Sequence, residues 1–391
     1  MATMKATAVI ALVFLVASLA VIPSLSALLQ GNWTAKAPML TDRYDLGAAV
    51  VNGRIYAIGG RDSLSKPGDP FQYTYAGINE EYNPATDTWT TKAPMPTPLQ
   101  DFGIAVYDDK IYCLGGTTIE VCNPANDTWE IKASMPHPRT QFEANMVDGK
   151  IYIMGGRTGG QYTSVTTNEA YDPATGEWTM KAPMLYPVVE HSSAVVGNKI
   201  YVMGGQNEFK VNDTMMMPYN QIYDTETDTW SLGAALPNSV WGAAGAAAGA
   251  LDSEIYLVGG QLDKMYDGTD LLQIYNPATD NWTIGAHMPT ARFDLAVAVL
   301  GDKLYALGGT DGYLFPGETS LRNNEVYAVN ERTTSPPEPK SQVDSLAIGL
   351  LIGGVAAAAS TVIIALAVAR KRARTAQLGG TTRCCWLAVV T

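Results

Sequence analysis

The chain has 391 residues and 47% apolar residues, so it is long enough to bury a large globular core. Its net charge is −12, but all 38 acidic residues lie between positions 28 and 345, where the net charge is −18. This acidic balance excludes nucleic-acid binding, because that function needs a basic surface.

Residues 1–27 have the features of a secretory signal peptide. The apolar run Ala8–Ala20 is followed by the small residues of Ser24–Ala27, which suit cleavage. An uncleaved anchor is the alternative, because the apolar pair Leu28-Leu29 follows. We therefore expect an exported chain.

One unit recurs six times between residues 32 and 330, and it is most complete at Asp45–Trp89. It has a run of small residues, a strand that ends in Gly-Gly, a polar loop, a strand that ends in Tyr, a turn with Pro, and a strand that begins at Trp. The Gly-Gly pairs are Gly59-Gly60, Gly115-Gly116, Gly155-Gly156, Gly204-Gly205, Gly259-Gly260 and Gly308-Gly309. Such a period, with several short strands in each copy, is typical of propeller blades.

These copies resemble the kelch repeats of β-propellers. The resemblance implies an all-β fold, a six-bladed kelch β-propeller with four antiparallel strands in each blade. The segment around Trp33 is an outer strand with no blade before it, and the last copy has no Trp after Tyr327. We expect Trp33 to complete blade six and to close the ring, which removes an open sheet edge. Kelch propellers include binding proteins and a few enzymes, so the fold leaves the function open.

The C-terminal region has the features of a membrane anchor. Residues 346–369 are 24 uncharged, mostly apolar residues, enough to span a bilayer. The basic residues that follow predict that the short tail, residues 370–391, is cytoplasmic. A Pro-rich stalk, residues 331–344, would then join the helix to the propeller, residues 32–330, outside the cell. Gly349 and Gly353 either pack two such helices into a weak homodimer or belong to an ordinary anchor.

When the copies are aligned at the start of each inner strand, charged residues occupy equivalent positions in several copies. Three copies have arginine there, and two residues later five copies have a polar side chain: Arg43, Arg139 and Arg292, then Asp45, Asp101, Gln141, Glu190 and Asp294, with His191 beside Glu190. Residues two apart share a face of a strand, so ring symmetry predicts that these residues meet at one mouth of the channel. In kelch binding proteins this inner rim commonly forms the ligand pocket, as the resemblance implies here. The alternative is that Arg43–Asp45 and Arg292–Asp294 pair with each other and join the blades.

Two hypotheses for function follow. An arginine cluster suits a carboxylate or sulfate, so an acidic sugar is a candidate ligand. The first hypothesis is a cell-surface binding or adhesion protein that recognises a protein or glycan outside the cell without catalysis. The alternative is a carbohydrate-active enzyme, a sialidase-like protein or a sugar epimerase or mutarotase, with Glu190 and His191 as proton shuttles. The chain has only three histidines, so we expect neither a metal nor a cofactor.

Two kinds of covalent modification are suggested by the exported location. Cys113 and Cys122 flank a short turn, and a hairpin with Thr117-Thr118 as its loop would place them opposite each other. An exported protein permits a disulfide between them, and two packed free thiols are the alternative. Glycosylation sequons begin at Asn32, Asn126, Asn212 and Asn281.

Overall fold

The computed structural model describes residues 31–329, except residues 63–73, 76, 160–162, 212–213, 239–245, 252, 262–267 and 313–319. The chain divides into two compact units, Met1–Asn330 and Glu331–Thr391, and all described residues belong to the first. Within the described residues every regular element is a β-strand, and no helix there could cross a membrane. The expected signal peptide, stalk, membrane helix with Gly349 and Gly353, and tail lie outside the described residues.

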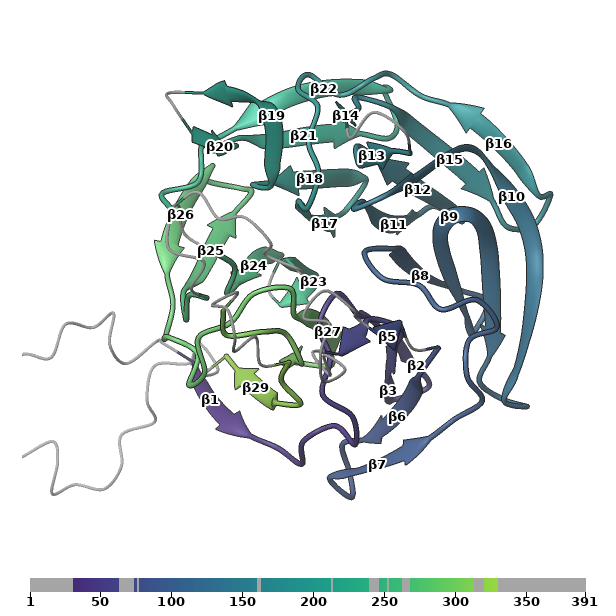
Figure 1. Cartoon of the computed structure of the whole chain (residues 1–391). Helices are drawn as coiled ribbons and strands as arrows, with labels where there is room; N and C mark the ends of the chain where they lie inside the picture. Colours follow the sequence, from purple (N-terminus) through teal and green to yellow (C-terminus); the bar gives the residue numbers. More distant parts are fainter. Residues whose placement is uncertain are drawn as a thin grey trace, which may run out of the picture. The chain divides into compact units, whose positions relative to one another are not determined.

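Six large β-sheets surround a common axis, as Figure 1 shows, and each sheet is one blade of a propeller. Named from the axis outward, blade one contains β2 (Gly47–Val51), β3 (Arg54–Ile58), β6 (Asn79–Asn83) and β7 (Thr88–Thr91). Blade two contains β8 (Gly103–Tyr107), β9 (Lys110–Asn123) and β10 (Thr128–Thr140), and it continues into β13 (Arg157–Thr158) and β14 (Thr163–Ser164). Blade three contains β11 (Glu143–Val147), β12 (Lys150–Met154), β15 (Asn168–Asp172) and β16 (Glu177–Met180).

The other three blades repeat the same order. Blade four contains β17 (Ser192–Val196), β18 (Lys199–Met203), β21 (Asn220–Asp224) and β22 (Thr229–Gly233), and blade five contains β23 (Ala246–Leu251), β24 (Glu254–Val258), β25 (Leu272–Asn276) and β26 (Asn281–Ile284). Blade six contains β27 (Ala296–Leu300), β28 (Lys303–Leu307), β29 (Asn324–Ala328) and β1 (Asn32–Ala35). Two small hairpins, β4 (Arg61–Asp62) with β5 (Thr74–Tyr75) and β19 (Gln206–Val211) with β20 (Thr214–Met216), lie between strands. The six-bladed all-β fold expected from the repeats is confirmed.

The ring closes as the sequence predicts. Strand β1 pairs antiparallel with β29, and Trp33 lies opposite Tyr327 in the register. The two rings pack with centroids 5.3 Å apart, and Trp33 Nε1 donates a hydrogen bond to the carbonyl of Ala286 in blade five at 2.8 Å. The first and last described strands of the propeller therefore share one sheet, which leaves no open edge between them.

Short turns and alternating side chains explain the strands of each blade. Asn52-Gly53 joins β2 to β3 with φ of 49° and 72°, values that suit a type I′ hairpin turn. Second-strand residues are almost wholly buried because each strand is covered on both faces by neighbouring sheets. The apolar core consequently lies between blades: Tyr82 in β6 packs on Tyr305 in β28, with ring centroids 6.0 Å apart.

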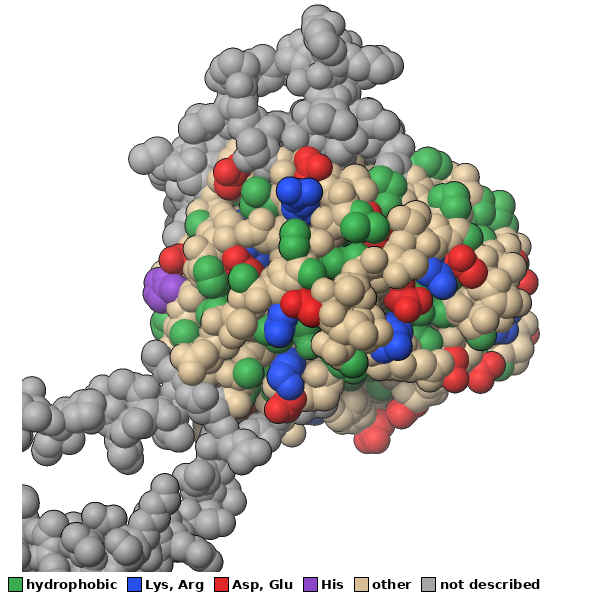
Figure 2. Space-filling model, turned by 90° about the horizontal axis from the view of Figure 1, so that it is seen from below, with side chains coloured by type: hydrophobic (Ala, Val, Ile, Leu, Met, Phe, Trp, Pro, Cys, Tyr) green, Lys and Arg blue, Asp and Glu red, His purple; other side chains and the backbone are tan. Residues whose placement is uncertain are grey.

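The outer edge of the propeller carries charges of both signs. Figure 2 shows the edge that lies at the bottom of Figure 1, where Lys and Arg side chains alternate with Asp and Glu. On this edge the negative net charge is therefore not gathered into one patch.

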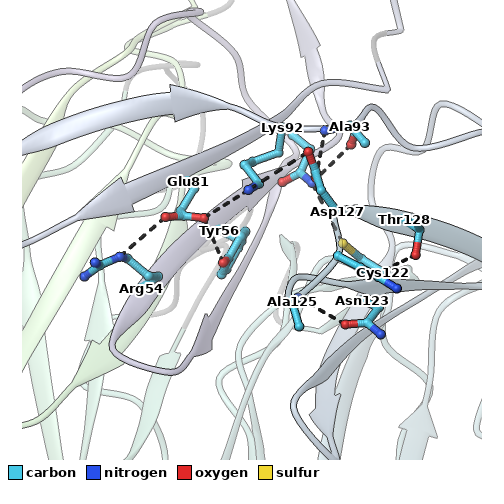
Figure 3. A network of polar contacts seen from close by, with 12 residues as sticks. Arg54, Tyr56, Glu81, Lys92, Ala93, Cys122, Asn123, Ala125, Asp127 and Thr128 are labelled. Carbon is cyan, nitrogen blue, oxygen red and sulfur yellow. Dashed lines mark hydrogen bonds and ion pairs between the residues drawn. The ribbon is translucent and has the colours of Figure 1, made fainter.

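Two hydrogen bonds clamp neighbouring blades together at the rim. The indole of the outer-strand Trp donates to the carbonyl of an Ala in the preceding linker at 2.8–2.9 Å, in Trp33–Ala286, Trp89–Ala37, Trp129–Ala93, Trp230–Ala182 and Trp282–Ala234. The N–H of that Ala donates to the Asp two residues before the Trp, in Ala37–Asp87, Ala93–Asp127, Ala182–Asp228 and Ala234–Asp280. Figure 3 shows one such clamp, in which Asp127 accepts from Ala93 beside Lys92.

The clamp is missing between blades two and three. Gly176 occupies the position that Asp holds in blades one, two, four and five. Correspondingly, the Tyr171 hydroxyl and the Trp178 indole nitrogen are buried and have no hydrogen-bond partner among the described residues. In blades one, four and five the equivalent Tyr hydroxyl donates to the Asp at 2.6–2.7 Å.

Cys113 and Cys122 are buried free thiols in the structure, in place of the predicted disulfide. In the other five blades the Tyr equivalent to Cys122 pairs with the residue equivalent to Ile111, as in Ile55 with Tyr82. The same register in blade two places Ile111 opposite Cys122, with Cys113 two residues away. The register of the other blades thus favours the alternative of two packed free thiols over the directly opposed pair that a two-residue hairpin loop predicts.

Candidate binding site at the channel mouth

The inner strands begin at one mouth of the central channel, and a polar residue stands two positions before five of the six. Asp45, Asp101, Gln141, Glu190 and Asp294 all have φ between 49° and 59°. This left-handed conformation costs a residue with a side chain on the order of 1–2 kcal/mol, and Asp and Asn adopt it more readily than most. The sixth equivalent position, Gly245, lies outside the described residues.

The left-handed turn lets backbone groups of neighbouring blades bond to each other around the axis. The N–H groups of four of these residues donate to the carbonyl of the equivalent residue in the preceding blade: Asp45 to Asp294 at 2.9 Å, Asp101 to Asp45 at 3.3 Å, Gln141 to Asp101 at 2.8 Å and Glu190 to Gln141 at 3.2 Å. These bonds hold the five side chains in an arc around the mouth. We call these five side chains the acidic collar.

The acidic collar encloses a cavity of about 50 Å³. Arg61 from β4 places its Nε 2.7 Å from Asp45 Oδ2, and the amides of Gln141 and Gln206 donate to the two carboxylate oxygens of Glu190. The four carboxyl groups of the collar and that of Glu143 thus line one small space, beside two amides and a guanidinium.

Close carboxyl groups in a buried space cannot all ionise. Burial raises the pKa of Asp101 well above its usual range, and the charges of Asp45, Asp294 and Glu190 raise it further, while Arg61 lowers it. Burial also raises the pKa of Asp45, against the opposing effects of Arg61 and of hydrogen bonds with Asp101 and Asp294. Asp101 is therefore the group of the collar that most readily holds a proton.

His191 lies against the same cavity and is 2% exposed. Neither of its ring nitrogens has a hydrogen-bond partner among the described residues. Burial lowers the pKa of His191 to about 4, so the imidazole is neutral at physiological pH. The ring carbon between the two nitrogens lies beside Gly155 and Met184, so the imidazole packs between blades three and four as Phe102 does between blades one and two.

The three predicted arginines lie behind the collar, inside their own blades, and are 0–1% exposed. Each guanidinium is ion-paired with a glutamate in the third strand, in the pairs Arg43–Glu80, Arg139–Glu169 and Arg292–Glu325. Each also donates to second-strand carbonyls, as Arg43 does to Ala57 at 3.1 Å. The structure thus brings the acidic and amide residues together at the mouth, together with His191, but separates the arginines from them.

The expected pairs Arg43–Asp45 and Arg292–Asp294 are consequently wrong. Asp45 and Asp294 are themselves in the left-handed conformation, so each does not share a face with the arginine two positions earlier as residues of a regular strand would. Sequence reasoning also missed Arg61 and Gln206, which come from the loops after Gly-Gly.

Beneath the collar a channel cavity of about 400 Å³ runs along the inner strands. Its walls are mostly small and apolar, and Leu46, Phe102 and Glu143 line both this cavity and the collar cavity. Burial raises the pKa of Glu143 to about 8. No three Asp, Glu, His or Cys side chains of the described residues are arranged to hold a metal ion.

The described sequon residues are accessible. Asn32, Asn126 and Asn281 are exposed at the outer strands or the turns before them, and Asn212 lies outside the described residues.

Comparison with known proteins identifies the family. A family model described as the Attractin/LZTR1 β-propeller matches residues 121–326, more than half of the chain, and a Kelch motif model matches residues 42–96. Kelch-like protein terF of Aspergillus terreus is 35% identical over 119 residues, which cover 29% of this chain and 25% of that protein. Kelch-like ECH-associated protein 1A of Danio rerio is 38% identical over 85 residues, which cover 22% of this chain and 13% of that protein.

A solved structure, titled Structure of YjhT, shares the fold. Its TM-score is 0.63 at 14% sequence identity, and the match covers 76% of this chain and 98% of that one. The matches to the curated relatives span a quarter of their length or less. The family match, the repeats and the six closed blades lead to one conclusion: the chain belongs to the Attractin/LZTR1 β-propeller family of kelch-repeat proteins.

Proposed function

We propose that this propeller is a binding module that engages a protein partner outside the cell through the channel mouth. Kelch propellers generally bind protein partners, which makes a protein the first candidate for the ligand. The observation that carries the proposal is the acidic collar, where five polar residues adopt a costly backbone conformation at the same place in their blades. Stability alone does not require carboxyl groups to meet there, because the backbone ring forms without side chains.

In this proposal the collar residues contact the partner, whereas His191 and the three arginines support the mouth. Each arginine is buried and already bonded to a glutamate, so releasing it to bind a sugar carboxylate would leave that glutamate without its partner. This geometry favours a ligand with positive charge over the acidic sugar suggested by the arginines alone.

We also propose that the propeller is exported and anchored. Residues 1–27 would direct export, residues 346–369 would span the cell membrane, and residues 331–344 and 370–391 would form the stalk and the cytoplasmic tail. The test is protease treatment of intact cells that express the full chain with a C-terminal tag. Loss of the propeller with retention of a tagged helix supports the topology, and a fully protected chain contradicts it.

Binding is tested with the full-length chain on an array of cell-surface and secreted proteins, beside a glycan array. We expect a retained protein whose binding falls in Asp101→Asn and is unchanged in Asp302→Asn, because Asp302 is a 75% exposed residue away from the collar. Retention of glycans alone, turnover of an acidic sugar, or equal binding by both variants would contradict the proposal.

A further inference from the structure

The seam between blades two and three lacks a carboxylate that other blades supply. We use the word seam for the contact of Tyr171 and Trp178 in blade three with Tyr112 and Ala133 in blade two. In blades one, four and five an aspartate accepts from the Tyr hydroxyl of its own blade at 2.6–2.7 Å and from the N–H of a linker Ala at 2.6–2.9 Å. Blade three has Gly176 in that place, where the chain is exposed and a Cβ would meet no atom within 4 Å. The place is therefore reached from solvent and has room for a carboxylate.

Two buried donors point to a missing acceptor at this seam. The Tyr171 hydroxyl and the Trp178 indole nitrogen are buried and have no partner in the described part of the chain, and Tyr171 is 0% exposed. Their rings nevertheless keep the usual arrangement, with centroids 5.1 Å apart against 5.0 Å in blades one and four. Strand β10 shifts its register between Ile131 and Ala133, so the Ala133 carbonyl does not serve Trp178 as the linker carbonyls serve the other tryptophans. Buried polar groups without a partner are rare in proteins, so an acceptor from outside the chain is indicated.

Blade six shows that a glycine in this place does not by itself leave the donors without partners. Gly31 stands two residues before Trp33, as Gly176 does before Trp178. The N–H of Gly31 donates to the Tyr327 hydroxyl at 3.0 Å, and the Trp33 indole donates to a linker carbonyl. Of the described blades, blade three alone leaves both rings without a hydrogen bond.

The charges around the seam suit an anion. In the clamp of Figure 3, Lys92 lies 4.0 Å from Asp127 Oδ2. Lys132 is the equivalent lysine at the seam, and its ion pair is a longer-range one with Glu130 at 3.9 Å. Asp172 and Glu130 are the acidic groups that act on the Tyr171 hydroxyl, so Lys132 offsets one of them. A hydroxyl and an indole N–H beside an ammonium match a carboxylate, which has two acceptor oxygens.

We propose that the seam between blades two and three binds a carboxylate group, in the place that an aspartate side chain holds in blades one, four and five. The carboxylate accepts hydrogen bonds from Tyr171 and Trp178, with Lys132 beside it. Its source is either a small organic acid or an acidic side chain of another protein. The site is built by an outer strand and not by the channel mouth, so this inference does not depend on the function proposed above.

The test titrates the full chain with sodium acetate against sodium chloride of equal ionic strength near neutral pH. Thermal unfolding gives the stabilisation, and magnetisation transfer from the protein to the acetate methyl protons, measured by NMR, reports binding directly. We expect acetate at ten times its half-saturating concentration to raise Tm by about 2 °C more than chloride does. N-acetyl-aspartate N-methylamide distinguishes the sources. A response to both probes assigns the site to an acidic side chain, and a response to acetate alone assigns it to a small organic acid.

Four variants give the effect opposite signs. Gly176→Asp supplies the carboxylate from the chain itself and should abolish both responses to acetate. Tyr171→Phe removes a donor and should weaken acetate binding about tenfold. Glu130→Gln removes a negative charge near the site and should tighten binding, which no loss of folding can imitate. Asp87→Gly is the matched control, because it removes the carboxylate from blade one and should make that blade respond to acetate as well.

No response of the wild-type chain to acetate would overturn the inference, most clearly if Asp87→Gly does respond. Equal responses of the wild-type chain and Gly176→Asp would show that acetate acts elsewhere and would also overturn it. A response that appears only in Glu130→Gln would mean that the glutamate of blade two is itself the acceptor, which contradicts a site for an external carboxylate.

Discussion

The missing clamp between blades two and three provides a test of how the blades are joined. Gly176 has φ of 80°, and its equivalents Asp87 and Asp228 have φ of 54°. An ideal Cβ at Gly176 would meet no atom within 4 Å, so an aspartate fits there without displacing a neighbour. Gly176→Asp should therefore accept a hydrogen bond from the buried Tyr171 hydroxyl, as the other aspartates do from their tyrosines.

The size of the gain follows from three contributions. A hydrogen bond to a charged group is worth about 1.5–3 kcal/mol, and we take the low end because the sister aspartates are exposed to solvent. The left-handed conformation costs aspartate about 1 kcal/mol, and removing the freedom of glycine in the unfolded chain returns about 0.4–1 kcal/mol. We expect a net gain of about 1 kcal/mol, or a rise in Tm of about 1–2 °C for a propeller that spans residues 31–329.

The assay is thermal unfolding of the full chain followed by circular dichroism. Gly149→Asp is the control, because Gly149 has φ of 77° and an equally open Cβ position but no tyrosine in the equivalent place. Gly176→Asp should lose its advantage in a Tyr171→Phe background. A Tm no higher than that of Gly149→Asp would refute the account of the clamp.

Three further predictions concern buried charges. Glu120 is fully buried in blade two, where Leu99 occupies the position that arginine holds in blades one, three and six. Glu120→Gln should therefore raise the free energy of unfolding, measured by chemical denaturation, by about 1 kcal/mol. A lower free energy of unfolding would contradict this prediction. Arg292→Leu leaves the buried Glu325 without its guanidinium partner and should lower the free energy of unfolding by about 3–5 kcal/mol. The double variant Arg292→Leu/Glu325→Gln should restore part of that loss. Equal losses in the single and double variants would argue against the ion pair. Burial raises the pKa of Glu143 from 4.5 to about 8, so the folded state holds this proton more tightly and stability falls as pH rises through that window. Unfolding at about pH 5 and pH 9 should show a smaller fall for Glu143→Gln, and parallel falls would contradict the assignment.

The fold could be predicted because each repeat carries its own strand pattern. The terminal copies are complementary: Trp33 has no blade before it, and Tyr327 has no Trp after it, so closure follows from the sequence. The strand pairing in blade two was harder to predict from the sequence than that in the other blades. Its short loop after Gly-Gly suggested a simple hairpin, and only the register of the other blades corrects the position of Cys122.

The position of the candidate site could be predicted from the sequence, but the charge of the site could not. Alignment of the repeats placed the mouth residues at one level, yet the left-handed turn that separates Arg43 from Asp45 depends on backbone bonds between blades. The sequence nevertheless contained a signal for the glutamate partners of the arginines. The three copies with arginine have glutamate two residues before Tyr, and blades four and five, which lack the arginine, have Gln221 and Gln273 there; blade two, with Leu99 and Glu120, is the exception. That correlation among internal repeats indicates a contact within each blade.

Binding of a retained protein partner to Asp101→Asn and Asp302→Asn tests most directly whether the channel mouth is the binding surface. The account predicts weaker binding by Asp101→Asn and unchanged binding by Asp302→Asn, because Asp101 lines the collar cavity and Asp302 is an exposed residue away from it. Equal binding by both variants and the wild-type chain would contradict it.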